Sequence, residues 1–109
     1  MHYDDSNVFA KILNKEIPCS KVYEDEHTLA FKDLHPKARI HILIIPKSKC
    51  KNFSDLLNMD AQFITNFFNG VKNTIKQVNP DNLDFKLLTN NGINAGQEIF
   101  HMHFHLLIN

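Results

Sequence analysis

Three histidines alternate with apolar residues near the end of this 109-residue sequence. His101, His103 and His105 would share one face of an extended strand, because successive side chains of a strand point to opposite faces. Neighbouring histidines on that face would lie roughly 7 Å apart. The opposite, core-facing side would be formed by Phe100, Met102, Phe104, Leu106 and Ile108. A strand with three imidazoles on its free face predicts chemistry at those imidazoles.

The residues alone leave three interpretations of this histidine face open. The histidines could be ordinary surface residues, although alternation does not explain why all three are imidazoles. They could bind zinc, because His-x-His on a strand can present two nitrogens to one ion and His41 could supply a third ligand. They could instead act on a phosphate group, with one histidine as nucleophile and its neighbours as hydrogen-bond donors.

Phosphate chemistry is favoured by the properties of imidazole and by the preceding loop. Imidazole has an unperturbed pKa of about 6.5, so it is largely neutral and nucleophilic at cellular pH. One ring nitrogen can attack phosphorus while a backbone carbonyl holds the proton on the other nitrogen. The loop contains Gly92 and Gly96, which allow backbone N–H groups to approach a phosphate, and the neutral donors Asn90 and Gln97.

Length, charge and cysteine content restrict the class of protein. The length suits a single domain over residues 1–109. The formal net charge is zero, which argues against the basic surface of a nucleic-acid-binding protein. Two isolated cysteines, a polar N-terminus and the lack of a long apolar run predict a cytoplasmic protein without a membrane partner.

Periodic patterns along the sequence predict the elements that position the histidines. A short helix is expected after Ser6 or Asn7, and a long amphipathic helix is expected to begin at Asn58 or Asp60 and to end at 79–81. Strands are expected at 21–24, 28–33, 40–45, 84–89 and 100–108. The predicted class is α+β, with an antiparallel sheet of about five strands, one long helix and a short N-terminal helix.

The run His-Met-His-Phe-His-Leu-Leu at 101–107 resembles the His-φ-His-φ-His-φ-φ signature (φ apolar) of the histidine triad (HIT) nucleotide-binding superfamily. The similarity continues through segments 8–12, 15–18, 29–36, 41–47 and 95–97, and through Asn90. Their order and the short chain look most like the Hint-like branch, the purine nucleoside phosphoramidases. The resemblance implies a single HIT domain, a purine mononucleotide of the AMP or GMP type as ligand, and a homodimer whose two five-stranded sheets join into one.

The resemblance also implies a role for each matching residue. His103 would be the nucleophile that forms a nucleotidyl-histidine intermediate, while His101 and His105 would orient it and contact phosphate. His41 would be a fourth active-site histidine, and Asp33 would accept hydrogen bonds from the ribose hydroxyls. The implied phosphate-binding residues are Asn90, Gly96, Gln97 and Glu98. The implied base pocket consists of Val8, Phe9, Ile12, Phe31 and Leu43. Neither a metal nor another cofactor is implied.

Three features depart from that pattern. Glu98 stands where close Hint relatives often carry serine, which places a carboxylate near the leaving group. Asn7 and Ala10 stand where many bacterial relatives have a zinc-binding Cys-x-x-Cys pair, so we expect no structural zinc. The sequence ends four residues after His105, where relatives usually continue into a tail.

The predicted activity is hydrolysis of purine nucleoside 5′-phosphoramidates, or of related mononucleotides substituted at the α-phosphate. Three alternatives remain. The first is a dinucleoside polyphosphate hydrolase of the same superfamily, although that branch usually has a longer chain after the histidines. The second is a nucleotide-binding regulatory protein with little turnover, and the third is a zinc-dependent protein that uses the histidine cluster.

Overall fold

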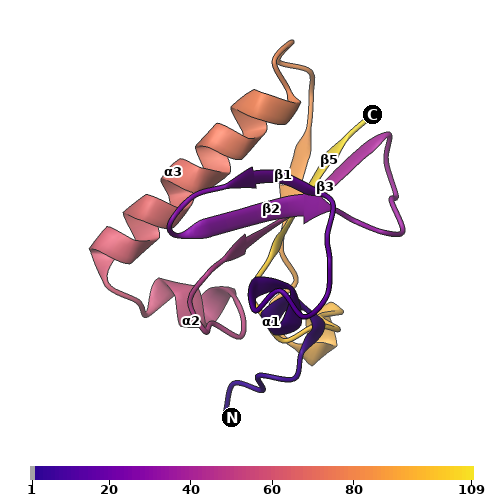
Figure 1. The fold of residues 1–109 in the computed structure, drawn as a ribbon. Coiled ribbons are helices and arrows are strands. Elements are labelled where there is room, and N and C mark those ends of the chain that lie inside the picture. The colour runs from indigo at the N-terminus through magenta and orange to yellow at the C-terminus, as the bar shows by residue number, and fades with distance from the viewer. Residues whose placement is uncertain (1) are drawn as a thin grey trace.

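The computed structural model describes residues 2–109 and contains one sheet flanked by helices (Figure 1). The strands are β1 (Lys21–Glu24), β2 (Thr28–Lys32), β3 (Ile40–Pro46), β4 (Lys86–Leu88) and β5 (Phe104–Ile108). The helices are α1 (Val8–Leu13), α2 (Phe53–Leu57), α3 (Ala61–Val78) and the 3₁₀ helix η1 (Ile93–Ala95). The sheet order is β1-β2-β3-β5-β4, and every neighbouring pair is antiparallel. The predicted α+β class and five-stranded antiparallel sheet are confirmed.

The sheet separates two hydrophobic cores, because each strand sends alternate side chains to its two faces. Helix α3 covers one face, where the core includes Ala30, Ile42, Ile44, Phe67, Met102, Phe104 and Leu106. Helix α1 lies on the other side of the strands, beside the start of β5 (Figure 1). There the core consists of Phe9, Leu29, Phe31, Leu43 and Ile45. The histidines of β3 and β5 belong to this second face, because Leu43 pairs directly with His105.

The long helix begins and packs as its sequence predicts. Asp60 is its N-cap, and the Asp60 carboxylate accepts a hydrogen bond from the Phe63 N–H. The predicted apolar stripe faces the sheet, where Phe67 and Val71 are buried. Helix and sheet approach each other most closely at Gly70, where an added Cβ would lie 2.0 Å from Thr28 Oγ1.

Several boundaries differ from the prediction. Strand β5 begins at Phe104 instead of Phe100, because the preceding segment leaves the ladder and the Met102 N–H donates to the carbonyl of Cys50 at 2.7 Å. Strand β4 covers only 86–88. The short helix α2 was not predicted, although its N-cap, Asn52, is a recognisable signal. None of the helices in residues 2–109 is long and apolar enough to cross a membrane.

Candidate active site

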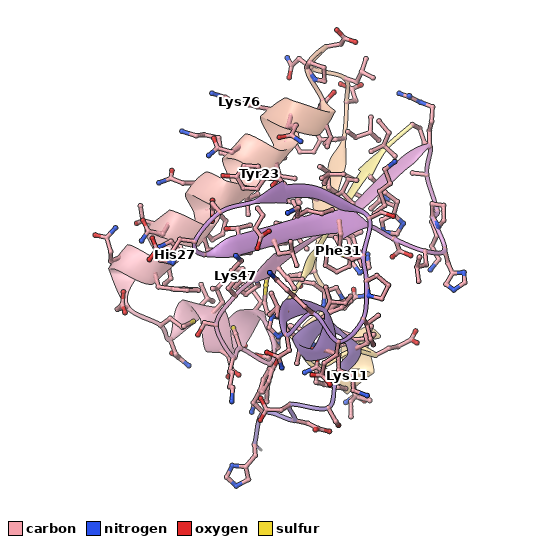
Figure 2. The ribbon with its side chains drawn as sticks, in the orientation of Figure 1. Lys11, Tyr23, His27, Phe31, Lys47 and Lys76 are labelled. Carbon is pink, nitrogen blue, oxygen red and sulfur yellow. The ribbon has the colours of Figure 1, made fainter. Side chains whose placement is uncertain are left out.

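A cavity of about 400 Å³ opens beside the histidine face of the sheet, between α1, the loop after β2 and the loop around η1. Every residue predicted to bind the nucleoside lines it: Val8, Phe9, Ile12, Phe31, Asp33 and Leu43. Every predicted phosphate-binding residue lines it as well: Asn90, Gly96, Gln97 and Glu98. Phe31 projects from β2 toward α1 (Figure 2), where its ring packs edge to face on Phe9. Of the four predicted catalytic histidines, His103 and His105 line the cavity, whereas His41 and His101 lie behind its wall.

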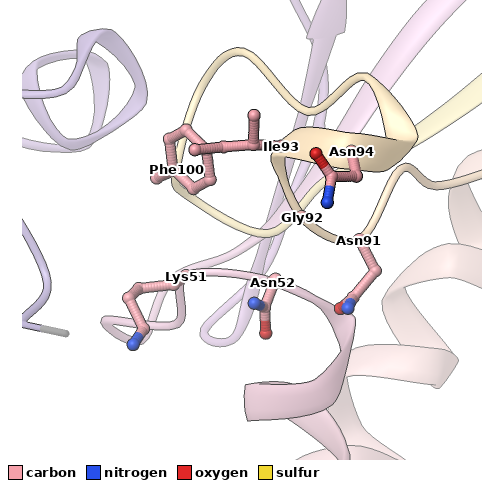
Figure 3. Close-up of a pocket in the computed structure, with 7 residues that line it drawn as sticks. All are labelled: Lys51, Asn52, Asn91, Gly92, Ile93, Asn94 and Phe100. Carbon is pink, nitrogen blue, oxygen red and sulfur yellow. The ribbon is translucent and has the colours of Figure 1, made fainter.

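A second cavity, of about 320 Å³, lies on the other side of the η1 loop (Figure 3). Phe100 and Ile93 form its apolar wall, and Asn52, Asn91 and Asn94 form much of the rest. Phe100 was predicted to face the core, but it is half-buried in this cavity and is not part of the core between the sheet and α3. None of the histidines lines this second cavity, so the predicted chemistry belongs to the first one.

The loop that carries the predicted phosphate-binding residues is held together by Gln97. This residue is buried, its Nε2 donates to the carbonyls of Lys51 and Ile99, and its Oε1 accepts the Gly92 N–H. Gly96 adopts a left-handed conformation at φ 92°, which turns the chain at the end of η1. Both N–H groups of the Gln97 side chain are therefore used within the protein, where they hold the loop in place.

A backbone carbonyl fixes the neutral tautomer of the His103 ring. Its Nδ1 lies 2.7 Å from the carbonyl oxygen of His101. Because a carbonyl can only accept, Nδ1 must carry the ring proton, and the lone pair is on Nε2. The Phe9 ring packs edge to face on this imidazole, with ring centroids 5.0 Å apart.

His101 is fully buried and uses both of its ring nitrogens inside the protein. Its Nε2 lies 2.8 Å from the carbonyl oxygen of Pro46, and its Nδ1 lies 2.5 Å from the hydroxyl of Tyr3. The His101 side chain is therefore placed to support its neighbours, while its backbone carbonyl holds His103.

His41 and His105 form a chain of hydrogen bonds with defined direction. The Lys37 N–H donates to His41 Nδ1 at 3.1 Å, so His41 carries its proton on Nε2. This Nε2 lies 3.0 Å from His105 Nδ1 and 3.5 Å from Asp33 Oδ2. His105 Nδ1 consequently accepts, and the proton of His105 is on Nε2. His105 can thus donate a hydrogen bond to a ligand in the cavity.

The same three side chains are the one cluster within residues 2–109 with the spacing of metal ligands. One ligand atom each from Asp33, His41 and His105 lies within 4.8 Å of the others. A metal on His41 Nε2 would require the ring proton on Nδ1, where it would face the Lys37 N–H. The hydrogen bonds therefore favour proton donors at this position over a metal centre.

Burial favours the neutral form of all three histidines of the triad. Desolvation lowers the pKa of His101 to about 4. It also lowers the pKa of His105 to about 4, and positive charge on His103 or His41 would lower it further. The pKa of His103 is lowered by burial too, against the opposing effect of its hydrogen bond to the His101 carbonyl. At neutral pH His103 therefore presents a lone pair to the cavity.

Several residues of the cavity wall were not predicted individually, although some of them lie in segments 15–18 and 29–36, which carry the family resemblance. The cavity is also lined by Ile17, Pro18, Cys19, Ser20, Lys32, Leu34, His35, Lys37 and Ile99. Lys32, Leu34 and His35 flank Asp33, so their proximity follows once Asp33 is placed. Tyr3, which contacts His101 without lining the cavity, was not predicted either. It lies 98 positions from His101, and no predicted site residue is adjacent to it in the sequence.

Comparison with known proteins shows the family of this chain. Residues 14–109 match the HIT domain family. An uncharacterised HIT-like protein of Helicobacter pylori is 43% identical over 101 residues, which make up 93% of this chain and 94% of that protein. A HIT-like protein of Rickettsia prowazekii is 39% identical over 106 residues, or 96% of this chain and 88% of that protein.

Solved structures share the fold over nearly the whole chain. One HIT-like protein superposes with a TM-score of 0.86 at 40% identity, covering 94% of this chain and 98% of that chain. A HIT family hydrolase from Clostridium thermocellum superposes with a TM-score of 0.84 at 34% identity, covering 97% of this chain and 92% of that chain. Sequence and fold together confirm the resemblance to the HIT superfamily, and the chain belongs to the HIT family.

Proposed function

We propose that this protein hydrolyses purine nucleoside 5′-phosphoramidates, or related mononucleotides substituted at the α-phosphate, through a nucleotidyl intermediate on His103. The observation that carries the proposal is the hydrogen bond between His103 Nδ1 and the His101 carbonyl, at the wall of a cavity. This bond leaves the Nε2 lone pair as the nucleophile. The likeness to a structure described as a HIT family hydrolase supports hydrolysis as the reaction class.

The cavity has the size and lining that a mononucleotide needs. Its volume of about 400 Å³ lies within the usual range for small-ligand sites. The base would lie against the apolar wall that includes Phe9, Phe31 and Leu43. Asp33 would accept the ribose hydroxyls, because its oxygens, which already face the His35 N–H and His41 Nε2, retain free lone pairs.

The phosphate would lie between the η1 loop and the histidine strand. Asn90 and the backbone at Gly96 face the cavity from the loop, and His105 can donate its Nε2–H from β5. These donors would stabilise the charge on the non-bridging oxygens as it redistributes in the transition state. Gln97 would hold the loop in the conformation that binds phosphate, without a hydrogen bond of its own to the phosphate.

The reaction would proceed in two displacements. His103 Nε2 forms a bond to the α-phosphorus, the P–N bond breaks, and the amine leaves with the electron pair and takes up a proton from water. The imidazolium formed on His103 is stabilised by the Nδ1–H bond to the His101 carbonyl. Water then attacks the phosphorus, the bond to Nε2 breaks, and the nucleoside monophosphate is released with loss of a proton. No metal is required in either step.

We propose further that the protein acts as a homodimer in the cytoplasm. Strand β4 lies at one edge of the sheet, and the segment before it exposes Leu83 and Phe85. Pairing of β4 with a second copy would cover these side chains and extend the sheet. Both cysteines, Cys19 and Cys50, are free, which supports a reducing compartment.

The proposed activity is tested with adenosine 5′-phosphoramidate and protein treated with a chelator. We expect wild-type protein to release AMP and His103→Ala to lose ~10³-fold or more in kcat/KM, because the nucleophile is removed. His27→Ala is the matched control, since His27 does not line the cavity and contacts Asn66 and Phe63 instead. This variant should keep wild-type activity.

Two results would contradict the proposal. Wild-type protein that binds AMP tightly but is as slow as His103→Ala would indicate a nucleotide-binding protein without turnover. Activity that disappears with the chelator and returns with zinc in stoichiometric amount would indicate metal-dependent chemistry at the histidine cluster.

A further inference from the structure

The segment before α1 contacts the triad from behind, away from the cavity. The Tyr3 hydroxyl lies 2.5 Å from His101 Nδ1, and the two rings meet edge to face with centroids 5.6 Å apart. Tyr3 does not line the cavity, so it has no place among the residues that would touch a nucleotide. The proposed reaction therefore gives this contact no role.

The direction of the contact follows from the other nitrogen of the ring. His101 Nε2 lies 2.8 Å from the Pro46 carbonyl, which can only accept, so Nε2 carries the proton. His101 Nδ1 is then an acceptor, and the Tyr3 hydroxyl is the donor. Burial raises the pKa of the Tyr3 hydroxyl and lowers the pKa of His101, so both groups keep these roles at neutral pH.

The two hydrogen bonds leave one orientation for the His101 ring. A flip of the imidazole would place carbon atoms opposite both Tyr3 and the Pro46 carbonyl, with the loss of two buried hydrogen bonds. The carbonyl of this fixed residue accepts the Nδ1–H of His103 at 2.7 Å. Phe9 of α1, the helix that follows the Tyr3 segment, also packs edge to face on both His101 and His103.

We propose that Tyr3 is a positioning residue, whose hydroxyl fixes the tautomer and ring orientation of His101 and, through the His101 carbonyl, the orientation of His103. Its kinetic consequence rests on the proposed function, whereas its effect on the two imidazoles does not. Because Tyr3 acts behind the cavity wall, its loss should affect the chemical step and leave nucleotide binding unchanged.

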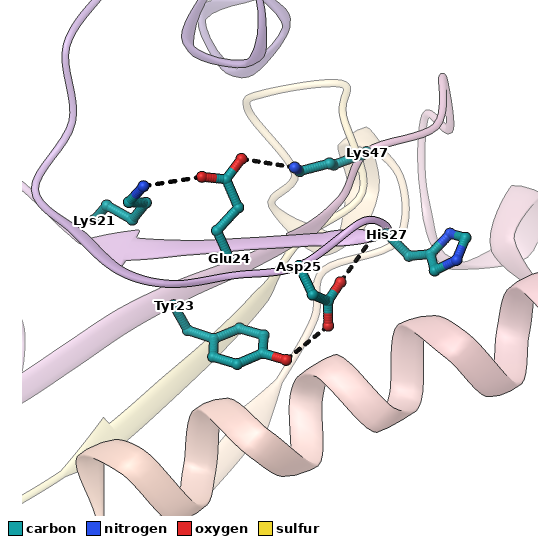
Figure 4. A network of polar contacts seen from close by, with 6 residues as sticks. All are labelled: Lys21, Tyr23, Glu24, Asp25, His27 and Lys47. Atoms are coloured by element: carbon teal, nitrogen blue, oxygen red, sulfur yellow. Dashed lines mark hydrogen bonds and ion pairs between the residues drawn. The ribbon is translucent and has the colours of Figure 1, made fainter.

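Tyr3→Phe tests the proposal, because it removes the hydroxyl and keeps the ring. Tyr23→Phe is the matched control: Tyr23 is the second of two tyrosines, and its hydroxyl donates to Asp25 on the β1–β2 hairpin (Figure 4). Nitrogen-15 NMR of the histidine side chains reports the tautomers directly. We expect the His101 Nδ1 resonance to move toward that of an acceptor without a partner in Tyr3→Phe, and the His103 Nδ1–H to exchange faster with water. Tyr23→Phe should change neither signal.

The kinetic measurement uses adenosine 5′-phosphoramidate with the same variants. We expect kcat to fall roughly tenfold in Tyr3→Phe with KM unchanged, the size of effect that loss of one buried hydrogen bond can have. Unchanged His101 and His103 signals in Tyr3→Phe would overturn the proposal, and so would an equal loss of kcat in Tyr23→Phe. Wild-type protein without phosphoramidase activity would refute the proposed function, while the two NMR signals would still decide whether Tyr3 positions the triad.

Discussion

At the scale of single residues, the three histidines of the triad differ in what their nitrogens can still do. His101 has a protein partner on each nitrogen, so its side chain has no hydrogen-bonding capacity left for a ligand. His103 uses Nδ1 alone, and its lone pair lies on Nε2. His105 accepts at Nδ1 and retains a proton for the cavity. The three histidines are therefore not equivalent: the first has no free ring nitrogen, the second has a free lone pair and the third has a free N–H.

The buried neutral state of His101 makes the protein sensitive to acid. Its pKa is about 4 in the folded chain and about 6.5 in an unfolded chain, so the unfolded state binds the extra proton between these values. The free energy of unfolding should therefore fall as pH falls from 6.5 toward 4, by up to roughly 1.4 kcal/mol per pH unit from this residue. Urea unfolding of wild-type protein and His101→Gln across this range measures the effect.

The His101→Gln variant should show a shallower loss of stability with falling pH, because glutamine does not titrate. His2→Gln, which removes an exposed histidine, should keep the wild-type dependence. Equal slopes for wild type and His101→Gln would show that His101 is not the group responsible.

Alternation predicted the histidine face, and the resemblance to the HIT superfamily implied the other residues around the cavity. Neither could predict which partners their polar atoms have. Strand periodicity placed His103 and His105 on one face, and the structure has both at the cavity wall. That Gln97 donates to the carbonyl of Lys51, 46 positions away, could not be predicted from the sequence around either residue. Tyr3 is still farther from its partner His101. Such contacts depend on how the elements pack, and no local pattern encodes them.

At the scale of elements, the position of the sheet depends on how closely α3 can approach it. Thr28 Oγ1 is buried against Gly70 and has no hydrogen-bond partner within residues 2–109. Alanine at position 70 would place its Cβ 2.5 Å from Thr28 Cβ, a distance that side-chain rotation cannot relieve. The helix would have to move away from β2.

Gly70→Ala should therefore destabilise the protein. Alanine favours a helix by about 1 kcal/mol over glycine, but overpacking a core costs about 1–3 kcal/mol or more. The 2.5 Å approach to Thr28 Cβ places the cost at the upper end of this range. We therefore expect a net loss of about 2 kcal/mol in the free energy of unfolding, measured by urea denaturation. Asn69→Ala on the exposed side of the same helix should stay within about 0.5 kcal/mol of wild type. A Gly70→Ala variant as stable as wild type would show that the helix is free to shift.

The elements that the sequence predicted best are those with a long, regular period. The apolar stripe of α3 spans five turns, and Asp60 marks its start, so its extent was predictable. Strand β5 was predicted too long, because alternation continues through His101 and Met102 although the backbone there pairs with the loop at Cys50. Helix α2 has five residues, too few for its periodicity to stand out.

At the scale of the whole molecule, the two edges of the sheet differ. The β1 edge is partly covered, because the Gln77 side chain of α3 donates to the Val22 carbonyl and Lys21 and Lys47 pair with Glu24 (Figure 4). The β4 edge instead follows a segment with exposed Leu83 and Phe85. The β4 edge is therefore the better candidate for pairing with a second copy.

We expect sedimentation velocity to show a dimer for wild-type protein and a monomer for Phe85→Asp, because a buried unpaired carboxylate opposes association. Leu57→Asp is the matched control, since Leu57 is an exposed residue of α2 and does not belong to β4 or to the segment before it. A monomeric wild-type protein, or a dimer that survives Phe85→Asp and dissociates with Leu57→Asp, would contradict pairing through β4.

The proposed mechanism requires that His103 carries the nucleotide during turnover. The most direct measurement is rapid acid-free quenching of wild-type protein with adenosine 5′-phosphoramidate, followed by mass spectrometry of the intact chain and of its peptides. We predict a transient adduct with the mass of an adenylyl group, localised to His103 and absent from His103→Ala. Rapid AMP release with no adduct at any time, or an adduct on His101, His105 or His41, would rule out His103 as the nucleophile.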